Sequence, residues 1–170
     1  VIEFKYSTDG ARLKFNNATD STEVMVPLSP YGSDKAGEML VPVETNAAYE
    51  VEVPVEWMAY KGSRAMRIDD LAFVYEPNKT GDVRNATVII KIGDKEMAKI
   101  LFSQKPIPTA LKLNPNEAEL VIGSALEFTP VVTPAAAQVY LDTTFAPQGN
   151  PDTLALAKVG GKVVVNPAYT

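Results

Sequence analysis

The residues of this chain that could do chemistry are aromatic rings, carboxylates and hydroxyls, because it contains no cysteine and no histidine. Without those two residue types there is no Ser-His-Asp or Cys-His nucleophilic system, no ordinary zinc site and no disulfide framework. The remaining candidates are the single tryptophan, Trp57, together with tyrosines, acidic residues and threonine or serine hydroxyls. The chemistry to consider is therefore stacking on sugar rings, acid-base catalysis by carboxylates, and modification of hydroxyls.

Acidic residues occur as a pair, Asp69-Asp70, and as a row made of Glu50, Glu52 and Glu56. Glycoside hydrolysis needs two carboxyl groups that flank the scissile bond at a defined separation. Adjacent residues of a strand point to opposite faces, so the aspartates do not flank one bond, and the glutamate row is typical of a solvated face. We therefore predict no catalytic residues, no enzyme activity and no cofactor.

Charge and composition argue against nucleic acid, metal ions and a membrane span. The net charge is −5 and the 16 basic residues are scattered, whereas a nucleic-acid site needs clustered Lys and Arg. Turns such as Gly81-Asp82 and Gly93-Asp94 lack the aspartate spacing of an EF-hand, so we predict no metal site. No apolar run approaches the ~20 residues of a membrane helix. We expect no transmembrane segment in this chain, and a lipid anchor would have to lie upstream of it.

The aromatic candidates depend on the strands that carry them, and the clearest predicted strand runs from Tyr49 to Trp57. Apolar residues stand at every second position of this stretch, and glutamates stand between them. Because successive side chains of a strand point to opposite faces, Trp57 is expected to turn toward the core and not toward a sugar. Pro54 donates no ladder hydrogen bond, which indicates an edge strand, a break or a bulge.

Tyr60 and Tyr31 are the better candidates for carbohydrate contact, because each lies near a glycine in a polar, turn-like stretch. The alternative is that each is an ordinary exposed tyrosine, since nothing in the sequence brings the two together.

The rest of the chain has the pattern of an all-β sandwich, with short alternating segments between Gly, Pro, Asn and Asp and no helical periodicity. Strands are predicted near Ile2–Tyr6, Arg12–Phe15, Glu23–Pro27, Glu38–Val43, Tyr49–Trp57, Leu71–Glu76, Ala86–Ile92 and Met97–Ser103. Gly93-Asp94 fits a primed hairpin turn. The residues expected to face the core of that hairpin are Val88, Ile90, Ile92, Ala98, Ile100 and Phe102.

The composition changes at Lys105-Pro106-Ile107-Pro108, a stiff connector that cannot continue a central strand. We therefore predict two domains, residues 1–106 and residues 107–170. Apolar alternation then resumes at Leu111 and Leu113, Leu120 and Ile122, and Leu126, Phe128 and Val132. Gly160-Gly161 is predicted to join a second hairpin between 155–159 and 162–165.

The first domain resembles the BACON modules of secreted and surface proteins of Bacteroidetes. The residues that carry the resemblance are Tyr49, Trp57, the segment Asn78–Thr87 and the end Phe102-Ser103-Gln104. The second domain resembles a bacterial immunoglobulin-like group 2 domain, through Leu111–Pro115, Leu120–Gly123, Pro134 and Ala157–Val163. These resemblances imply two immunoglobulin-like β-sandwiches in tandem. That second family has a further closing strand, so we expect the chain to be a fragment of a longer protein.

The same resemblances imply an exported protein, at the outer-membrane cell surface or in the periplasm. They imply a non-catalytic module that spaces or presents a glycan-binding or glycan-degrading partner, with a polysaccharide or a glycan-active domain of the same protein as its partner. The alternative is a structural adhesin or pilus-type subunit that assembles by strand donation. Three Asp-Ser/Thr stretches resemble the O-glycosylation motif of Bacteroides, which makes Ser21, Thr143 and Thr153 candidate modification sites.

Overall fold

The computed structural model describes residues 10–15, 22–33, 39–62, 68–117, 119, 126–137, 139, 154–159 and 162–167. All regular structure in these ranges is β-strand, so the protein is all-β, as predicted. The chain divides into two compact units, unit 1 (Val1–Ile107) and unit 2 (Pro108–Thr170). Among the described residues there is no helix with the length and apolar character needed to cross a membrane.

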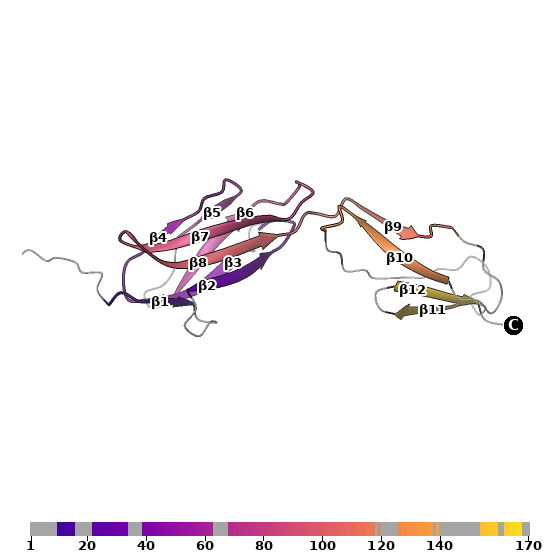
Figure 1. Ribbon diagram of the computed structural model, residues 1–170, viewed down its shortest axis with the longest axis horizontal. Coiled ribbons are helices and arrows are strands. Elements are labelled where there is room, and N and C mark those ends of the chain that lie inside the picture. The colour runs from indigo at the N-terminus through magenta and orange to yellow at the C-terminus, as the bar shows by residue number, and fades with distance from the viewer. Residues whose placement is uncertain are drawn as a thin grey trace, which may run out of the picture. The chain divides into compact units, whose positions relative to one another are not determined.

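Unit 1 contains two four-stranded sheets (Figure 1). The first has the order β1-β3-β6-β5, with antiparallel neighbours throughout. The second has the order β2-β8-β7-β4, in which β2 and β8 are parallel and the other neighbours antiparallel. The strand bounds are β1 Leu13–Phe15, β2 Glu23–Leu28, β3 Met39–Thr45, β4 Glu50–Glu52, β5 Met58–Tyr60, β6 Ile68–Tyr75, β7 Arg84–Ile92 and β8 Lys95–Gln104.

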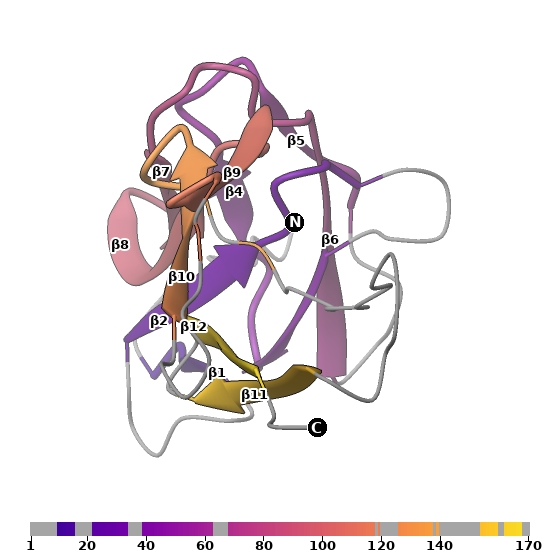
Figure 2. The same ribbon diagram turned by 90° about the vertical axis from the view of Figure 1, so that its right-hand side faces the viewer.

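The core of unit 1 lies between these two sheets. The turned view in Figure 2 separates β6 of the first sheet from β8 of the second. Phe73 of β6 and Phe102 of β8 meet with ring centroids 5.0 Å apart in an edge-on arrangement. Both are almost completely buried. The unit is therefore sandwich-like, with apolar faces of two sheets packed on each other.

The predicted hairpin at Gly93-Asp94 is confirmed. Ile92 pairs with Lys95 across the turn, and Gly93 has a φ of 58°, a left-handed value that glycine adopts at little steric cost. The six side chains expected to face the core are all buried, namely those of Val88, Ile90, Ile92, Ala98, Ile100 and Phe102. Local alternation and one turn were sufficient to define this element.

The stretch predicted as a strand from Tyr49 to Trp57 is not one element but is broken around Pro54, which is one of the three outcomes that this proline indicated. β4 ends at Glu52 and pairs with β7 of the second sheet, whereas β5 begins at Met58 and pairs with β6 of the first sheet. Pro54 lies between β4 and β5. No described strand pairs with this segment, so the sheets lose no hydrogen bond through the missing N–H of proline. The predicted alternation nevertheless holds, because the glutamates are exposed and the apolar residues pack against the core.

Unit 2 contains one antiparallel sheet with the order β11-β12-β10-β9. Its strands are β9 Ala110–Asn114, β10 Leu126–Thr133, β11 Leu154–Val159 and β12 Lys162–Pro167. β11 and β12 pair antiparallel up to Val159 and Lys162, as the second predicted hairpin requires. The strand predicted near Ile2–Tyr6, the alternation at Leu120 and Ile122, and the Gly160-Gly161 turn lie outside the described residues.

Candidate functional site

Three polar side chains meet where β8 ends, and we call Asn78, Arg84 and Gln104 the polar hub. Gln104 is the last residue of β8, and its register partner Arg84 is the first residue of β7. Asn78 lies in the loop between β6 and β7. Asn78 and Gln104 are both 0% exposed, so their polar atoms must find partners inside the protein.

The amide of Asn78 is fully engaged. Its Nδ2 donates to the carbonyl oxygens of Asp82, at 2.8 Å, and Gln104, at 3.0 Å. Its Oδ1 accepts from the backbone N–H of Thr80, at 3.1 Å, and from the Thr80 hydroxyl, at 2.7 Å. These bonds close the loop from Asn78 to Asp82 onto the end of β8, which makes Asn78 a structural residue.

The amide of Gln104 joins strands of both sheets. Its Nε2 donates to the carbonyl oxygen of Ser29, just after β2, at 2.7 Å, and to that of Glu76, just after β6, at 2.9 Å. Its Oε1 accepts from Arg84 Nε at 2.7 Å. Arg84 also donates through a terminal nitrogen to the Glu76 carbonyl oxygen at 2.6 Å. Partial burial lowers the pKa of the Arg84 guanidinium, and the Glu76 carboxylate partly offsets this effect.

Trp57 is held by the same hub. Its ring is half-buried and packs against the core, and the guanidinium carbon of Arg84 lies over the ring, 4.1 Å from its centroid. A cation over an aromatic face is attracted by the electron density of that face. One face of the ring is thus occupied by the protein itself, which agrees with the prediction that Trp57 is not a sugar platform.

Tyr31 is exposed on a turn whose backbone is fixed. Its side chain is 62% exposed, and its N–H donates to the Ser29 hydroxyl. The turn is pinned by Asn78, whose N–H donates to the Pro30 carbonyl at 2.8 Å, and by Ser33, whose N–H donates to the Tyr75 carbonyl at 2.9 Å. The structure therefore presents Tyr31 as a solvent-facing ring on a rigid support.

The backbone of this turn also depends on Gly32. Its φ of +85° is left-handed, and a Cβ built there would lie 2.8 Å from the backbone nitrogen of Pro77. Real side chains do not tolerate so close a contact with backbone. The turn therefore packs directly on the segment that follows β6, and this close approach requires glycine.

Tyr60 lies in a different environment. It is the last residue of β5, it is half-buried, and its ring lies 5.6 Å from the Phe73 ring. Within the described part of the chain, the Tyr60 ring contacts the core residue Phe73, and no ring contact joins Tyr60 to Tyr31. The two tyrosines that the sequence offered together are therefore one exposed ring and one ring at the edge of the core.

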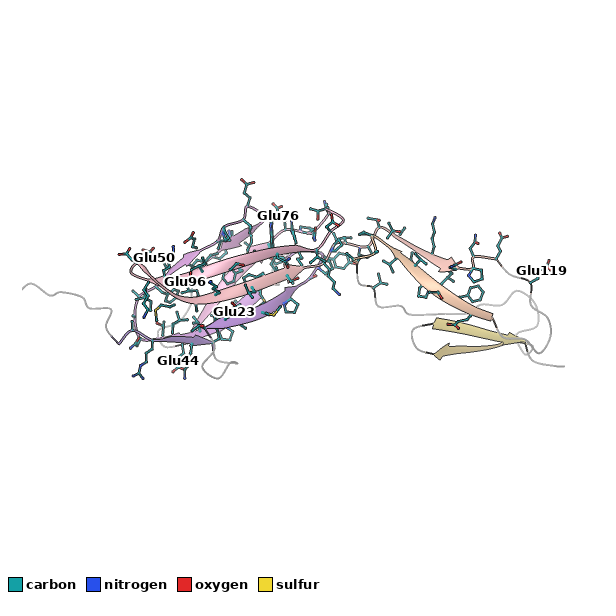
Figure 3. All side chains as sticks on the ribbon, viewed as in Figure 1. Glu23, Glu44, Glu50, Glu76, Glu96 and Glu119 are labelled. Atoms are coloured by element: carbon teal, nitrogen blue, oxygen red, sulfur yellow. The ribbon has the colours of Figure 1, made fainter. Side chains whose placement is uncertain are left out.

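The carboxylates of unit 1 lie on its surface, where Figure 3 labels Glu23, Glu44, Glu50, Glu76 and Glu96. Glu50 and Glu96 both lie opposite Lys91 in the sheet. Exposed ion pairs join Glu44 to Lys14 at 2.8 Å and Glu96 to Lys99 at 3.0 Å.

A third exposed pair joins Glu52 to Lys91, and the hydrogen bond from Lys91 to Glu52 raises the pKa of the Lys91 ammonium group. Across the described ranges, no group of three or more His, Cys, Asp or Glu side chains could hold a metal ion. The candidate modification sites Ser21, Thr143 and Thr153 lie outside the described residues.

Comparison with known proteins adds a distant likeness to a solved structure. No family model matches the chain, and neither does any curated protein. Among solved structures, it is similar to a Bacteroides ovatus GH5 xyloglucanase in complex with a XXXG heptasaccharide, with a TM-score of 0.43 and 17% identity. The match covers 56% of this chain and 19% of that chain. A likeness this distant carries no argument about fold or activity.

Proposed function

We propose that this chain is a non-catalytic cell-surface module that spaces or presents a glycan-binding or glycan-degrading partner. In this proposal both units are immunoglobulin-like, the first related to BACON modules and the second to bacterial immunoglobulin-like group 2 domains. The protein is exported to the outer-membrane surface or the periplasm, and its partner is a polysaccharide or a glycan-active domain of the same protein.

The observation that carries the proposal is that the polar side chains of the hub are bonded to the protein itself. Asn78 and Gln104 are buried with their amides bonded to the protein, and Arg84 is shared between Gln104, Glu76 and the Trp57 ring. A ligand site needs a few convergent polar groups that remain available to the ligand. These residues instead fasten strands together, as a stiff spacer requires.

Tyr31 is the residue on which weak sugar binding would depend. An aromatic ring stacks on a sugar with little loss of conformational freedom when its backbone is already fixed. A single ring supplies little contact area, so spacing is the main role and sugar binding is secondary.

Affinity gel electrophoresis of the full chain in a panel of intact polysaccharides tests whether the chain acts as a spacer or binds sugar. We expect migration unchanged by any polysaccharide, as for a spacer. Retardation that Tyr31→Ala abolishes would overturn the spacer interpretation in favour of sugar binding. Met25→Ala is the matched control, because Met25 is 74% exposed on β2 and lies outside the Tyr31 turn.

Two further measurements test the rest of the proposal. The chain should release no reducing sugar from the same polysaccharides, and release above a boiled control would contradict a non-catalytic role.

Mass spectrometry of native material should find hexose additions on peptides that contain Ser21, Thr143 or Thr153. Their absence from all three would remove the support that these motifs give to export.

A second candidate function is a structural subunit that assembles by strand donation. β9 lies at the edge of its sheet with all five residues exposed, and Leu111 and Leu113 on one of its faces are 51% and 45% exposed. An open edge can accept a strand from another chain, although Lys112 in the middle disfavours self-pairing. Sedimentation over a range of concentrations should show a monomer, and open-ended assembly would favour this second candidate.

A further inference from the structure

The parallel pair β2–β8 has a mechanical consequence. Six register pairs join the strands, from Glu23 with Lys99 to Leu28 with Gln104. Because the strands run in the same direction, the start of β2 and the end of β8 lie at opposite ends of this ladder. Tension that enters before β2 and leaves after β8 therefore pulls the two strands past each other along their length.

Each end of this ladder is extended by one more bond. At the entry end, the Lys99 N–H donates to the Thr22 carbonyl at 2.8 Å. At the exit end, Gln104 Nε2 donates to the Ser29 carbonyl at 2.7 Å. The hydrogen bonds of the ladder lie across the direction of pull, so they share the force and have to break together.

The other connections of unit 1 leave β2–β8 as the pair on which its resistance to force depends. β8 is held on its other side by β7 over nine register pairs, so β8 is not the strand that leaves first. β1 pairs with β3 over three residues, and Asn46 holds the backbone just before β1. This attachment is shorter than the six-pair ladder of β2 and β8, so we expect it to yield first and pass the tension to β2. Leu28 of β2 and Phe102 of β8 are both buried, so sliding also exposes core side chains.

We propose that β2 and β8, fastened at their exit end by Gln104, form a clamp that resists tension along the chain. Unit 1 then unfolds under force only when the whole parallel ladder ruptures. Forced unfolding is governed by the unfolding barrier and not by equilibrium stability, so a clamp can protect a module of ordinary stability. The clamp is a property of unit 1 and stands whether or not the chain spaces a glycan partner.

Single-molecule pulling through cysteine handles tests the clamp on the full chain, which has no cysteine of its own. Thr22→Cys with Lys105→Cys loads β2–β8 in shear. Tyr31→Cys with Lys105→Cys pulls at one end of the same ladder and separates its pairs one at a time. All three sites are exposed. We expect a several-fold higher unfolding force in the first geometry, and equal forces would overturn the proposal.

A pair of variants then separates force resistance from stability. In the shear geometry, Gln104→Met removes the fastening bonds and should lower the unfolding force. Met58→Ala weakens the core at β5, a strand that pairs with β6 at the end of the first sheet, and should leave that force nearly unchanged, even where urea denaturation shows a comparable loss of stability. Forces that follow equilibrium stability in both variants would contradict the clamp. If Gln104→Met does not fold, the two handle geometries decide the matter alone.

Discussion

The guanidinium carbon of Arg84 lies 4.1 Å from the centroid of the Trp57 ring. The same side chain donates to Gln104 Oε1 and to the Glu76 carbonyl oxygen. One cation therefore joins the only tryptophan of the chain to the buried end of β8. Trp57, Arg84 and Gln104 come from three separate stretches of the sequence, and the Arg84 side chain brings them together.

Replacing Arg84 by methionine should destabilise unit 1. The variant loses the contact with Trp57 and leaves Gln104 Oε1 without its donor, which together cost roughly 2–3 kcal/mol of unfolding free energy. Urea denaturation followed by Trp57 fluorescence measures the loss. Lys79→Met removes the same charge from an exposed site and should change the stability by less than about 0.5 kcal/mol. Equal effects of the two substitutions would mean that the hub contributes nothing specific.

Asn78→Asp should produce a loss of stability that depends on pH. A carboxylate at this buried site would face the carbonyl oxygens of Asp82 and Gln104 that the Nδ2 group now donates to, so its pKa in the folded state is raised. The folded state then binds the proton more tightly than the unfolded chain, in which aspartate titrates near about 3.9. The loss, roughly 3 kcal/mol at neutral pH, should therefore shrink as the pH falls.

Urea denaturation at several pH values measures this dependence. Asn85→Asp is the matched control, because Asn85 is exposed on β7. Its stability relative to the parent protein should be nearly constant with pH. A pH-independent loss for Asn78→Asp would contradict the raised pKa.

Gly32→Ala and Gly81→Ala should differ although both glycines have left-handed backbones, with φ of +85° and +89°. At Gly81 a Cβ meets nothing within 4 Å, so alanine costs only the backbone strain of about 1–2 kcal/mol. At Gly32 the new Cβ also collides with Pro77, which adds roughly 1–3 kcal/mol. Thermal denaturation should place Gly32→Ala well below Gly81→Ala, and equal melting temperatures would show that the turn moves away from Pro77 at little cost.

Phe73 and Phe102 should be energetically coupled across the two sheets. Their edge-on rings, with centroids 5.0 Å apart, predict a coupling of about 0.5–1.5 kcal/mol in a double-mutant cycle of Phe73→Leu and Phe102→Leu. Combining Phe73→Leu with Val131→Ala, at an exposed site on β10 of unit 2, should instead be additive within about 0.5 kcal/mol. Additivity of the phenylalanine pair would mean that the ring contact contributes nothing beyond burial.

The sequence predicted those features of the fold that depend on residues close together in the chain. The β7–β8 hairpin was predicted because a glycine turn and strict alternation lie next to each other in the chain. The break after Glu52 was not located, because periodicity reports which face a residue takes and not which sheet its strand joins. Pro54 supplied the only hint of a break, and the three possibilities it left open were settled by pairing with β7 and β6.

The polar hub was missed, although one signal for it was present in the sequence. Gln104 continues the inward alternation of Ile100 and Phe102, and all three side chains are buried. A polar residue at an inward position has to be hydrogen-bonded, so it indicates a buried network. Its partners could not be predicted, because Ser29 reaches it through the pairing of β2 with β8 and Glu76 through the packing of the two sheets.

The sequence by itself determined an all-β protein, the hairpins, the inward side of each alternating stretch and the inward turn of Trp57, because these follow from side-chain periodicity and turn chemistry. The tertiary structure alone decided that Tyr31 is exposed while Tyr60 packs on Phe73, that Arg84 covers Trp57, and that β2 runs parallel to β8. Those relationships join residues distant in the chain, so they form only when the strands pair within each sheet and the two sheets of unit 1 pack together.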